Sequence, residues 1–126
     1  EVISHNLETV RRLTPSIRSR ATYDMSLEVV RQVAESGVIS KSGIMLGLGE
    51  TREEILQTMD DLRSVGCRVM TIGQYLQPTA ANVEVKEYVT PQVFDEYKRI
   101  GLEKGFTHVE SGPLVRSSYH AERHIK

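Results

Sequence analysis

The sequence predicts an α/β fold with a parallel sheet, because apolar, β-branched runs alternate with amphipathic stretches of about a dozen residues. Parallel neighbours in one sheet are joined by right-handed crossovers, and repeated crossovers are typical of a βα barrel. The predicted strands, at 2–3, 38–46, 68–76 and 106–110, are too few to close such a barrel. We therefore expect residues 1–126 to form part of one barrel domain. We also expect poor stability for the isolated chain, because strand edges and apolar helix faces would stay uncovered.

The first predicted helix is short and follows the first strand. Asn6 has a side chain suited to an N-cap, so the helix is expected to begin near Leu7 and to close at Thr14-Pro15. Four basic residues around it are expected to cover the solvent side of this helix and the following turn, namely Arg11, Arg12, Arg18 and Arg20.

Three longer helices are predicted from apolar spacing and end signals. The one at 24–36 has an inward stripe of Leu27, Val30, Val33 and Ala34, and Gly37 follows it. The next opens with a capping box at Thr51-Arg52-Glu53-Glu54, stops at Gly66 and faces inward with Ile55, Met59, Leu62 and Val65. The last starts at Thr90-Pro91, ends at Gly105 and is expected to bury Phe94, Tyr97 and Leu102.

Composition places the chain among ordinary globular proteins and gives no electrostatic argument for a nucleic acid or a membrane as partner. The 126 residues are 39% hydrophobic and 26% charged, and the formal net charge is -1, which provides no attraction to a polyanion. No apolar run approaches the roughly 18 residues of a membrane span, and no secretory signal is evident. A cytoplasmic location is therefore expected.

The single cysteine, Cys67, excludes an intrachain disulfide and any site that needs several cysteines of this chain. It follows Gly66 and enters an apolar strand, so we interpret it as a small buried residue rather than a metal ligand.

Polar and glycine-rich segments fall at the predicted carboxyl ends of the strands, where βα barrels place their sites. They are residues 5–8, 47–50 and 74–77. The Gly47-Leu48-Gly49 run fails both standard phosphate fingerprints, because Arg52 stands where a third glycine belongs and no Gly-Lys-Ser or Gly-Lys-Thr follows. Taken alone, this run also fits a plain βα turn in which Glu50 interacts with the helix dipole.

Four motifs together resemble the lipoyl synthases, a family of radical S-adenosylmethionine (SAM) enzymes. They are His5-Asn6-Leu7-Glu8-Thr9, the run from Lys41 to Thr51, Gly73-Gln74-Tyr75-Leu76-Gln77-Pro78-Thr79, and Arg116-Ser117-Ser118-Tyr119-His120-Ala121. Their order and spacing match the C-terminal half of such an enzyme. The resemblance implies a partial, TIM-like (β/α) barrel of the radical SAM type with a terminal extension, in which about residues 106–126 contribute to an auxiliary cluster site.

The resemblance also implies which residues bind the cofactors. SAM would be contacted by residues at the strand ends, namely Asn6, Glu8, Gly43, Gly47, Glu50, Gln74, Tyr75 and Leu76. Ser118, or alternatively Ser117, would ligate an iron of the auxiliary cluster as an alkoxide, and Arg116 would bind substrate. Alternatives stay open: Asn6 and Glu8 could belong to a helix cap, Tyr75 could pack inward, and the two serines could only satisfy turn backbone groups.

The reaction implied for the full-length enzyme is that of a sulfurtransferase, which inserts two sulfur atoms at C6 and C8 of a protein-bound octanoyl group to make the lipoyl cofactor. It would use SAM and two [4Fe-4S] clusters, one binding SAM and one donating sulfur. None of the six cluster cysteines is in this sequence, so we expect the N-terminal half to be missing and the chain alone to be inactive.

The implied partners are an octanoylated lipoyl-domain protein or the glycine-cleavage H protein, and an electron donor such as ferredoxin or flavodoxin. One segment, 80–85, lacks the basic residues, histidine and proline that the family commonly has there, which puts partner affinity in doubt. Two other interpretations remain, a biotin-synthase-like sulfur-inserting enzyme and a non-catalytic module that binds a nucleotide or partner. The Arg-Ser-Ser-Tyr motif argues against the first.

Overall fold

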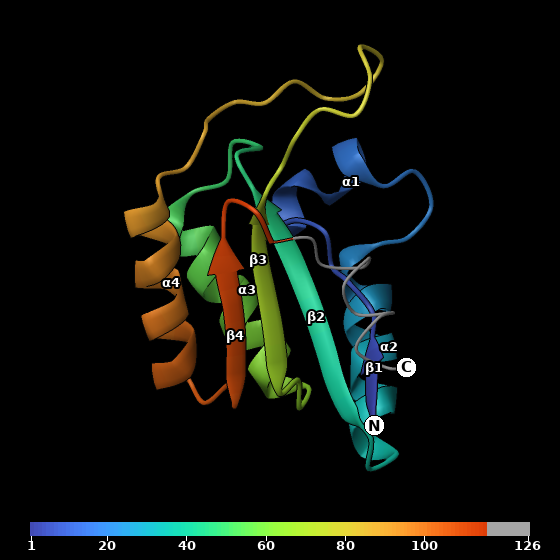
Figure 1. The fold of residues 1–126 in the computed structure, drawn as a ribbon. Helices are drawn as coiled ribbons and strands as arrows, with labels where there is room; N and C mark the ends of the chain where they lie inside the picture. The colour runs from blue at the N-terminus through green and yellow to red at the C-terminus, as the bar shows by residue number, and fades with distance from the viewer. Residues whose placement is uncertain (116–126) are drawn as a thin grey trace.

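The computed structural model describes residues 1–115 and contains a parallel sheet whose strands follow one another in chain order (Figure 1). The strands are β1 (Val2–Ser4), β2 (Ile39–Leu46), β3 (Val69–Gln74) and β4 (His108–Gly112), and all three pairings are parallel. The predicted α/β class and parallel sheet are confirmed, and four parallel strands in sequential order form part of a β/α barrel.

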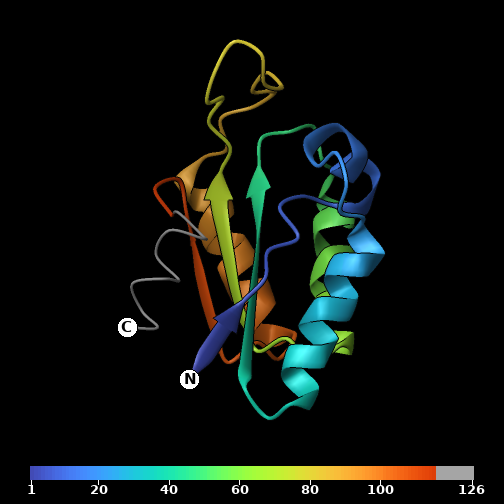
Figure 2. The same ribbon diagram turned by 90° about the vertical axis from the view of Figure 1, so that its right-hand side faces the viewer.

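Three helices of 13 residues form the second layer: α2 (Tyr23–Glu35), α3 (Arg52–Ser64) and α4 (Pro91–Glu103). Figure 2 shows α2 and α3 side by side on one face of the sheet. A single apolar core joins all three helices to the even-numbered residues of β2 and β3. Its largest fully buried members include Phe94, Leu7, Ile44, Leu46, Met59, Leu62, Met70 and Ile72.

The boundaries of the long helices follow local signals in the sequence. Thr51 accepts a hydrogen bond from the Glu54 amide, and the Glu54 carboxylate accepts one from the Thr51 amide, which completes the predicted capping box. Gly66, with φ of +89°, follows α3 in the left-handed conformation that glycine adopts without strain.

The first predicted helix is wrong in its position. Residues 7–10 are not helical, with Glu8 in an isolated bridge and a bend at Thr9, and the helical segment is a 3₁₀ turn, η1 (Arg11–Leu13), followed by the short α1 (Thr14–Ile17). Asn6 is therefore not a helix cap, and Pro15 lies in the first turn of α1 instead of ending a helix. The physical reason is tertiary, because the Glu8 amide donates to Gly43 O (3.0 Å) and its carbonyl accepts from the Met45 amide (2.9 Å).

The inward face of α4 also differs from the prediction. Phe94 and Tyr97 are buried as expected, but Leu102 is 45% exposed. Gly101 takes the inward position, and a Cβ there would lie only 3.1 Å from the Val109 side chain. Close approach of α4 to β4 therefore uses a glycine, and the adjacent leucine is turned to solvent.

Within residues 1–115, no helix is long and apolar enough to cross a membrane.

Candidate functional site

The carboxyl ends of the strands form one edge of the sheet, and the predicted polar segments meet there. In Figure 1, all arrows point toward this edge, and α1, the turn after β2 and the long loop after β3 lie on it. Glu8 pairs with Ile44 in an isolated parallel bridge just beyond β1, which brings it beside β2. The sequence prediction of a shared edge is confirmed by this topology.

Glu8 has the most unusual environment among the predicted site residues. It is the one non-glycine residue between 1 and 115 with positive φ, at 72°, and such backbone strain clusters at functional sites. Burial raises the pKa of its carboxyl, an effect opposed by the nearby Arg18 guanidinium and by a hydrogen bond from the Asn6 side chain. The fold thus holds a desolvated acid at the strand ends at some cost in stability.

Arg18 is a member of this site that the sequence prediction missed. It was expected on the solvent side with Arg11, Arg12 and Arg20, but it is only partly exposed. Its Nη1 donates to Asn6 O (3.3 Å) and to Ser26 Oγ (2.6 Å). The sequence signal for this contact was the motif containing Asn6. Arg18 follows that motif in the same connection between β1 and α2, so its long side chain can reach back to the Asn6 backbone.

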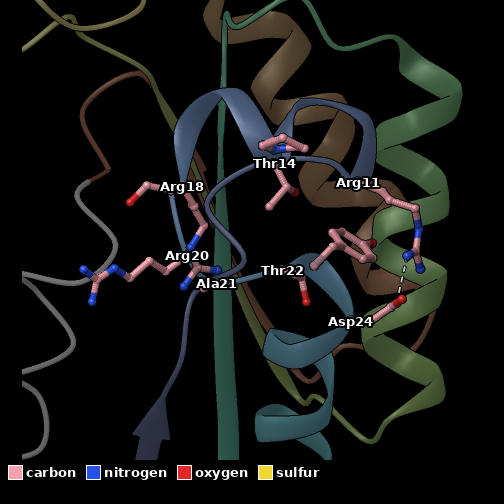
Figure 3. Close-up of a pocket in the computed structure, with 10 residues that line it drawn as sticks. Arg11, Thr14, Arg18, Arg20, Ala21, Thr22 and Asp24 are labelled. Atoms are coloured by element: carbon pink, nitrogen blue, oxygen red, sulfur yellow. Dashed lines mark hydrogen bonds and ion pairs between the residues drawn. The ribbon is translucent and has the colours of Figure 1, made fainter.

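A hollow of about 330 Å³ lies in the connection between α1 and α2 (Figure 3). Arg18 and Arg20 project to one side of this connection, while Arg11 projects to the other and pairs with Asp24 at 2.8 Å. The side that bears Arg18 is therefore cationic, and it adjoins the partly buried Glu8 carboxylate.

The Gly47–Glu50 turn is held by its own acid. The Glu50 carboxylate accepts hydrogen bonds from the Gly47 amide (2.9 Å) and the Leu48 amide (3.0 Å). Gly47 and Gly49 have φ values of +100° and +102°, so both glycines are needed for the backbone conformation. These contacts are those of a plain βα turn, the alternative interpretation of the Gly47-Leu48-Gly49 run.

Gln74 and Tyr75 use their side chains to hold the loop that follows β3. Gln74 Nε2 donates to Tyr75 O (3.0 Å) and Glu87 O (2.9 Å), and its Oε1 accepts from the Val89 amide (2.9 Å). Tyr75 is buried, and its hydroxyl donates to Val83 O at 2.6 Å. These side chains therefore fix the chain that borders the site.

The same packing explains why residue 47 is a glycine. A Cβ at Gly47 would lie 2.4 Å from both Gln74 Nε2 and Glu87 O. The atoms that pack against the Gly47 backbone therefore belong to Gln74 and Glu87 of this chain. Of the other predicted residues, Leu76 is 45% exposed, and Gly43 accepts the hydrogen bond from the Glu8 amide.

The segment after β4 returns to the sheet at the same edge. The Val115 amide donates to Gly112 O (3.2 Å), which closes a turn, and Val115 O lies so near Gly73 that a Cβ there would be 2.4 Å away. The predicted site residues Arg116, Ser117 and Ser118 lie outside the described residues.

Cys67 is fully buried, as predicted, and burial raises the pKa of its thiol to about 11. Thiolate is the form that binds iron, so this environment disfavours ligation. No group of three or more His, Cys, Asp or Glu side chains in the part of the chain that the structure describes could hold a metal. Residues 1–115 thus do not fit an iron–sulfur cluster.

Comparison with known proteins identifies the relatives of this chain. The sequence model of the Radical SAM superfamily matches residues 1–62. A lipoyl synthase of Treponema denticola is 75% identical over 99% of this chain, and those of Bacteroides fragilis and Bacteroides thetaiotaomicron are 63% and 64% identical over all of it. The chain is thus similar to lipoyl synthases over its whole length. It spans 43% to 45% of the length of these relatives.

At the strand-end edge of the sheet, the structure places Asn6, Glu8 and the Gly47–Glu50 turn, and it adds Arg18. Gln74 and Tyr75 lie at the same edge, but their polar side-chain atoms are bonded to the chain's own backbone. The partly buried acid and the arginine are therefore the groups whose chemistry is best suited to a polar, charged ligand.

Proposed function

We propose that this chain supplies one part of a lipoyl synthase, the sulfurtransferase that inserts two sulfur atoms at C6 and C8 of a protein-bound octanoyl group. The observation that carries the proposal is the 75% identity to the Treponema denticola lipoyl synthase over 99% of the chain. Residues 1–126 would then be one portion of a radical SAM barrel, and residues 106–126 would contribute to the auxiliary cluster site.

The strand-end edge is proposed to bind SAM through Asn6, Glu8, Gly43, Gly47, Glu50, Gln74, Tyr75 and Leu76. The donor set fits such a ligand, since a partly buried carboxylate suits ribose hydroxyls or an ammonium group and the Arg18 guanidinium suits a carboxylate. We add Arg18 to this site on the basis of its bonds to Asn6 O and Ser26 Oγ. When bound, SAM supplies the radical that abstracts hydrogen from the octanoyl chain.

Two [4Fe-4S] clusters are proposed for the complete enzyme, with their cysteines outside this chain. We propose Ser118, with Ser117 as the alternative, as an iron ligand of the sulfur-donating cluster, and Arg116 as a substrate-binding residue. Ser118 follows Val115 by three residues, which limits their separation to about 11 Å. Val115 itself packs against Gly73 at the strand ends, so this reach supports the proposal.

The proposed substrates are an octanoylated lipoyl-domain protein or the glycine-cleavage H protein, and the electron donor is a ferredoxin or flavodoxin. The long loop after β3 borders the strand-end edge, and Tyr88 in it is 71% exposed, which supports a contact between this loop and such a protein. Its 80–85 segment departs from the family pattern, and weaker affinity for the acyl carrier is expected from this change.

The experiment that tests the serine assignment uses a chimaera in which this chain replaces the matching segment of the Treponema denticola lipoyl synthase. Ser118→Ala and Ser118→Cys are compared with the unsubstituted chimaera for SAM cleavage and for sulfur insertion into an octanoyl peptide. We expect both variants to cleave SAM and to lose sulfur insertion. The same substitutions at Ser117 decide between the two serines, and sulfur insertion at the normal rate by both Ser118 variants contradicts the assignment.

A further inference from the structure

Ser26 connects two side chains at the strand-end edge of the sheet. It lies near the start of α2 and is 1% exposed. Its Oγ accepts a hydrogen bond from Arg18 Nη1 at 2.6 Å and lies 3.2 Å from His5 Nε2. One buried hydroxyl therefore joins the chain that follows β1, the connection that follows α1, and helix α2.

The chemistry of the three groups fixes the direction of both hydrogen bonds. A guanidinium has only donors, so the serine oxygen accepts from Arg18 and keeps its own proton for another partner. Burial, and then the charge of Arg18, lower the pKa of His5, which favours a neutral ring with one nitrogen free to accept. The Ser26 hydroxyl thus accepts from Arg18 and donates to His5, and both bonds orient it.

The Arg18 guanidinium is held at one nitrogen and open at the others. Nη1 makes the bond to Ser26 and a longer one of 3.3 Å to Asn6 O. Between residues 1 and 115, no partner is bonded to Nε or Nη2. The group also lies close enough to Glu8 to oppose the rise that burial causes in the pKa of that carboxyl. Two N–H donors of Arg18 are therefore available to a ligand, and a carboxylate matches their spacing.

We propose that Ser26 is a positioning residue that holds Arg18 for the carboxylate of SAM, and so favours ligands that carry the amino acid part of SAM. The proposal rests on the proposed function, in which Arg18 belongs to the SAM site. Without the Ser26 hydroxyl, Arg18 keeps only the long bond to Asn6 O, and its side chain regains rotamer freedom. We expect affinity for a ligand with this carboxylate to fall about tenfold, the usual effect of losing one hydrogen bond to a charged group.

The test measures the binding of two ligands to the chimaera by isothermal titration calorimetry. S-adenosylhomocysteine and methylthioadenosine share the adenosine and the sulfur atom, but methylthioadenosine lacks the amino and carboxylate groups. Ser26→Ala should weaken binding of S-adenosylhomocysteine about tenfold and leave binding of methylthioadenosine unchanged. Alanine is smaller than serine and favourable in a helix, so this variant is expected to fold.

Ser40→Ala is the matched control. Ser40 is also 1% exposed, and its hydroxyl donates to Gly66 O at 3.2 Å, near the amino end of β2 and away from the strand-end edge. This variant also loses one buried serine hydroxyl, yet its affinity for each ligand should equal that of the unsubstituted chimaera.

A double-mutant cycle shows whether Ser26 acts through Arg18. In an Arg18→Ala background, Ser26→Ala should cause no further loss of affinity for S-adenosylhomocysteine, because the side chain that it positions is gone. Three results overturn the proposal: equal weakening of both ligands by Ser26→Ala, no weakening of either, or the full tenfold loss in the Arg18→Ala background. If the unsubstituted chimaera binds neither ligand, the proposed SAM site itself fails, and this inference fails with it.

Discussion

Replacing Gln74 by methionine separates the structural use of this side chain from a contact with SAM. Methionine has nearly the same length but neither amide group, so Gln74→Met removes the three hydrogen bonds to Tyr75 O, Glu87 O and the Val89 amide. Each hydrogen bond contributes about 1 kcal/mol net, so the local opening free energy of the loop should fall by about 2 to 3 kcal/mol.

This loss predicts a measurable change in hydrogen exchange. Because 1.4 kcal/mol corresponds to a factor of ten, amides of the 86–89 segment should exchange roughly 30- to 150-fold faster in the variant. Lys86 reports on the segment directly, since its amide donates to Gly47 O at 2.7 Å. Exchange is followed by mass spectrometry in the chimaera and in the Gln74→Met variant.

Gln77→Met is the matched control, because Gln77 Nε2 makes one exposed hydrogen bond to Asn82 O in the same loop. Its effect on the 86–89 amides should be negligible. Unchanged exchange in Gln74→Met, together with weaker SAM binding, would instead indicate that the Gln74 amide contacts SAM and does not hold the loop.

Two further predictions concern the buried acid and the core. Glu8→Gln should raise the thermal unfolding midpoint at pH 7 while weakening SAM binding, since the raised pKa of Glu8 means that its ionised form destabilises the fold. The gain should shrink as the pH falls through that raised pKa, where the native carboxyl is protonated, and a pH-independent gain would contradict the desolvation argument. Phe94→Ala should cost about 3 to 5 kcal/mol in urea unfolding of the chimaera, because Phe94 is fully buried. Leu102→Ala should stay within about 0.5 kcal/mol, and comparable losses at the two positions would contradict the observed face of α4.

The sequence was sufficient for the long elements because their signals are local. The capping box at Thr51, the glycine stop at Gly66 and the apolar spacing of α2 to α4 each lie within a few residues of the boundary that they predict. The strands were found for the same reason, and their alternation with helices predicted the parallel sheet. Burial of Cys67 likewise followed from the apolar strand beside it.

The parts that the sequence did not predict depend on contacts distant in the chain. Leu7 and Glu8 are helix formers locally, but the backbone bonds of Glu8 to Gly43 and Met45 keep this segment out of a helix. The position of the Arg18 side chain depends on its hydrogen bond to Ser26, which lies in α2. The hydrogen bonds that the Gln74 amide donates depend on carbonyl groups up to 13 residues away. The sequence motifs indicated this edge of the sheet. Which of its side chains form hydrogen bonds with the chain's own backbone is seen only in the structure.

Product formation by the chimaera shows whether this chain can provide a functional part of a lipoyl synthase. Mass spectrometry of the octanoyl peptide, with SAM and a reductant present, measures whether two sulfur atoms are inserted. We expect lipoyl peptide from the chimaera with roughly eight irons bound, as needed for two [4Fe-4S] clusters, and none from the isolated chain. A folded chimaera that holds both clusters and cleaves SAM but forms no lipoyl peptide would contradict the claim.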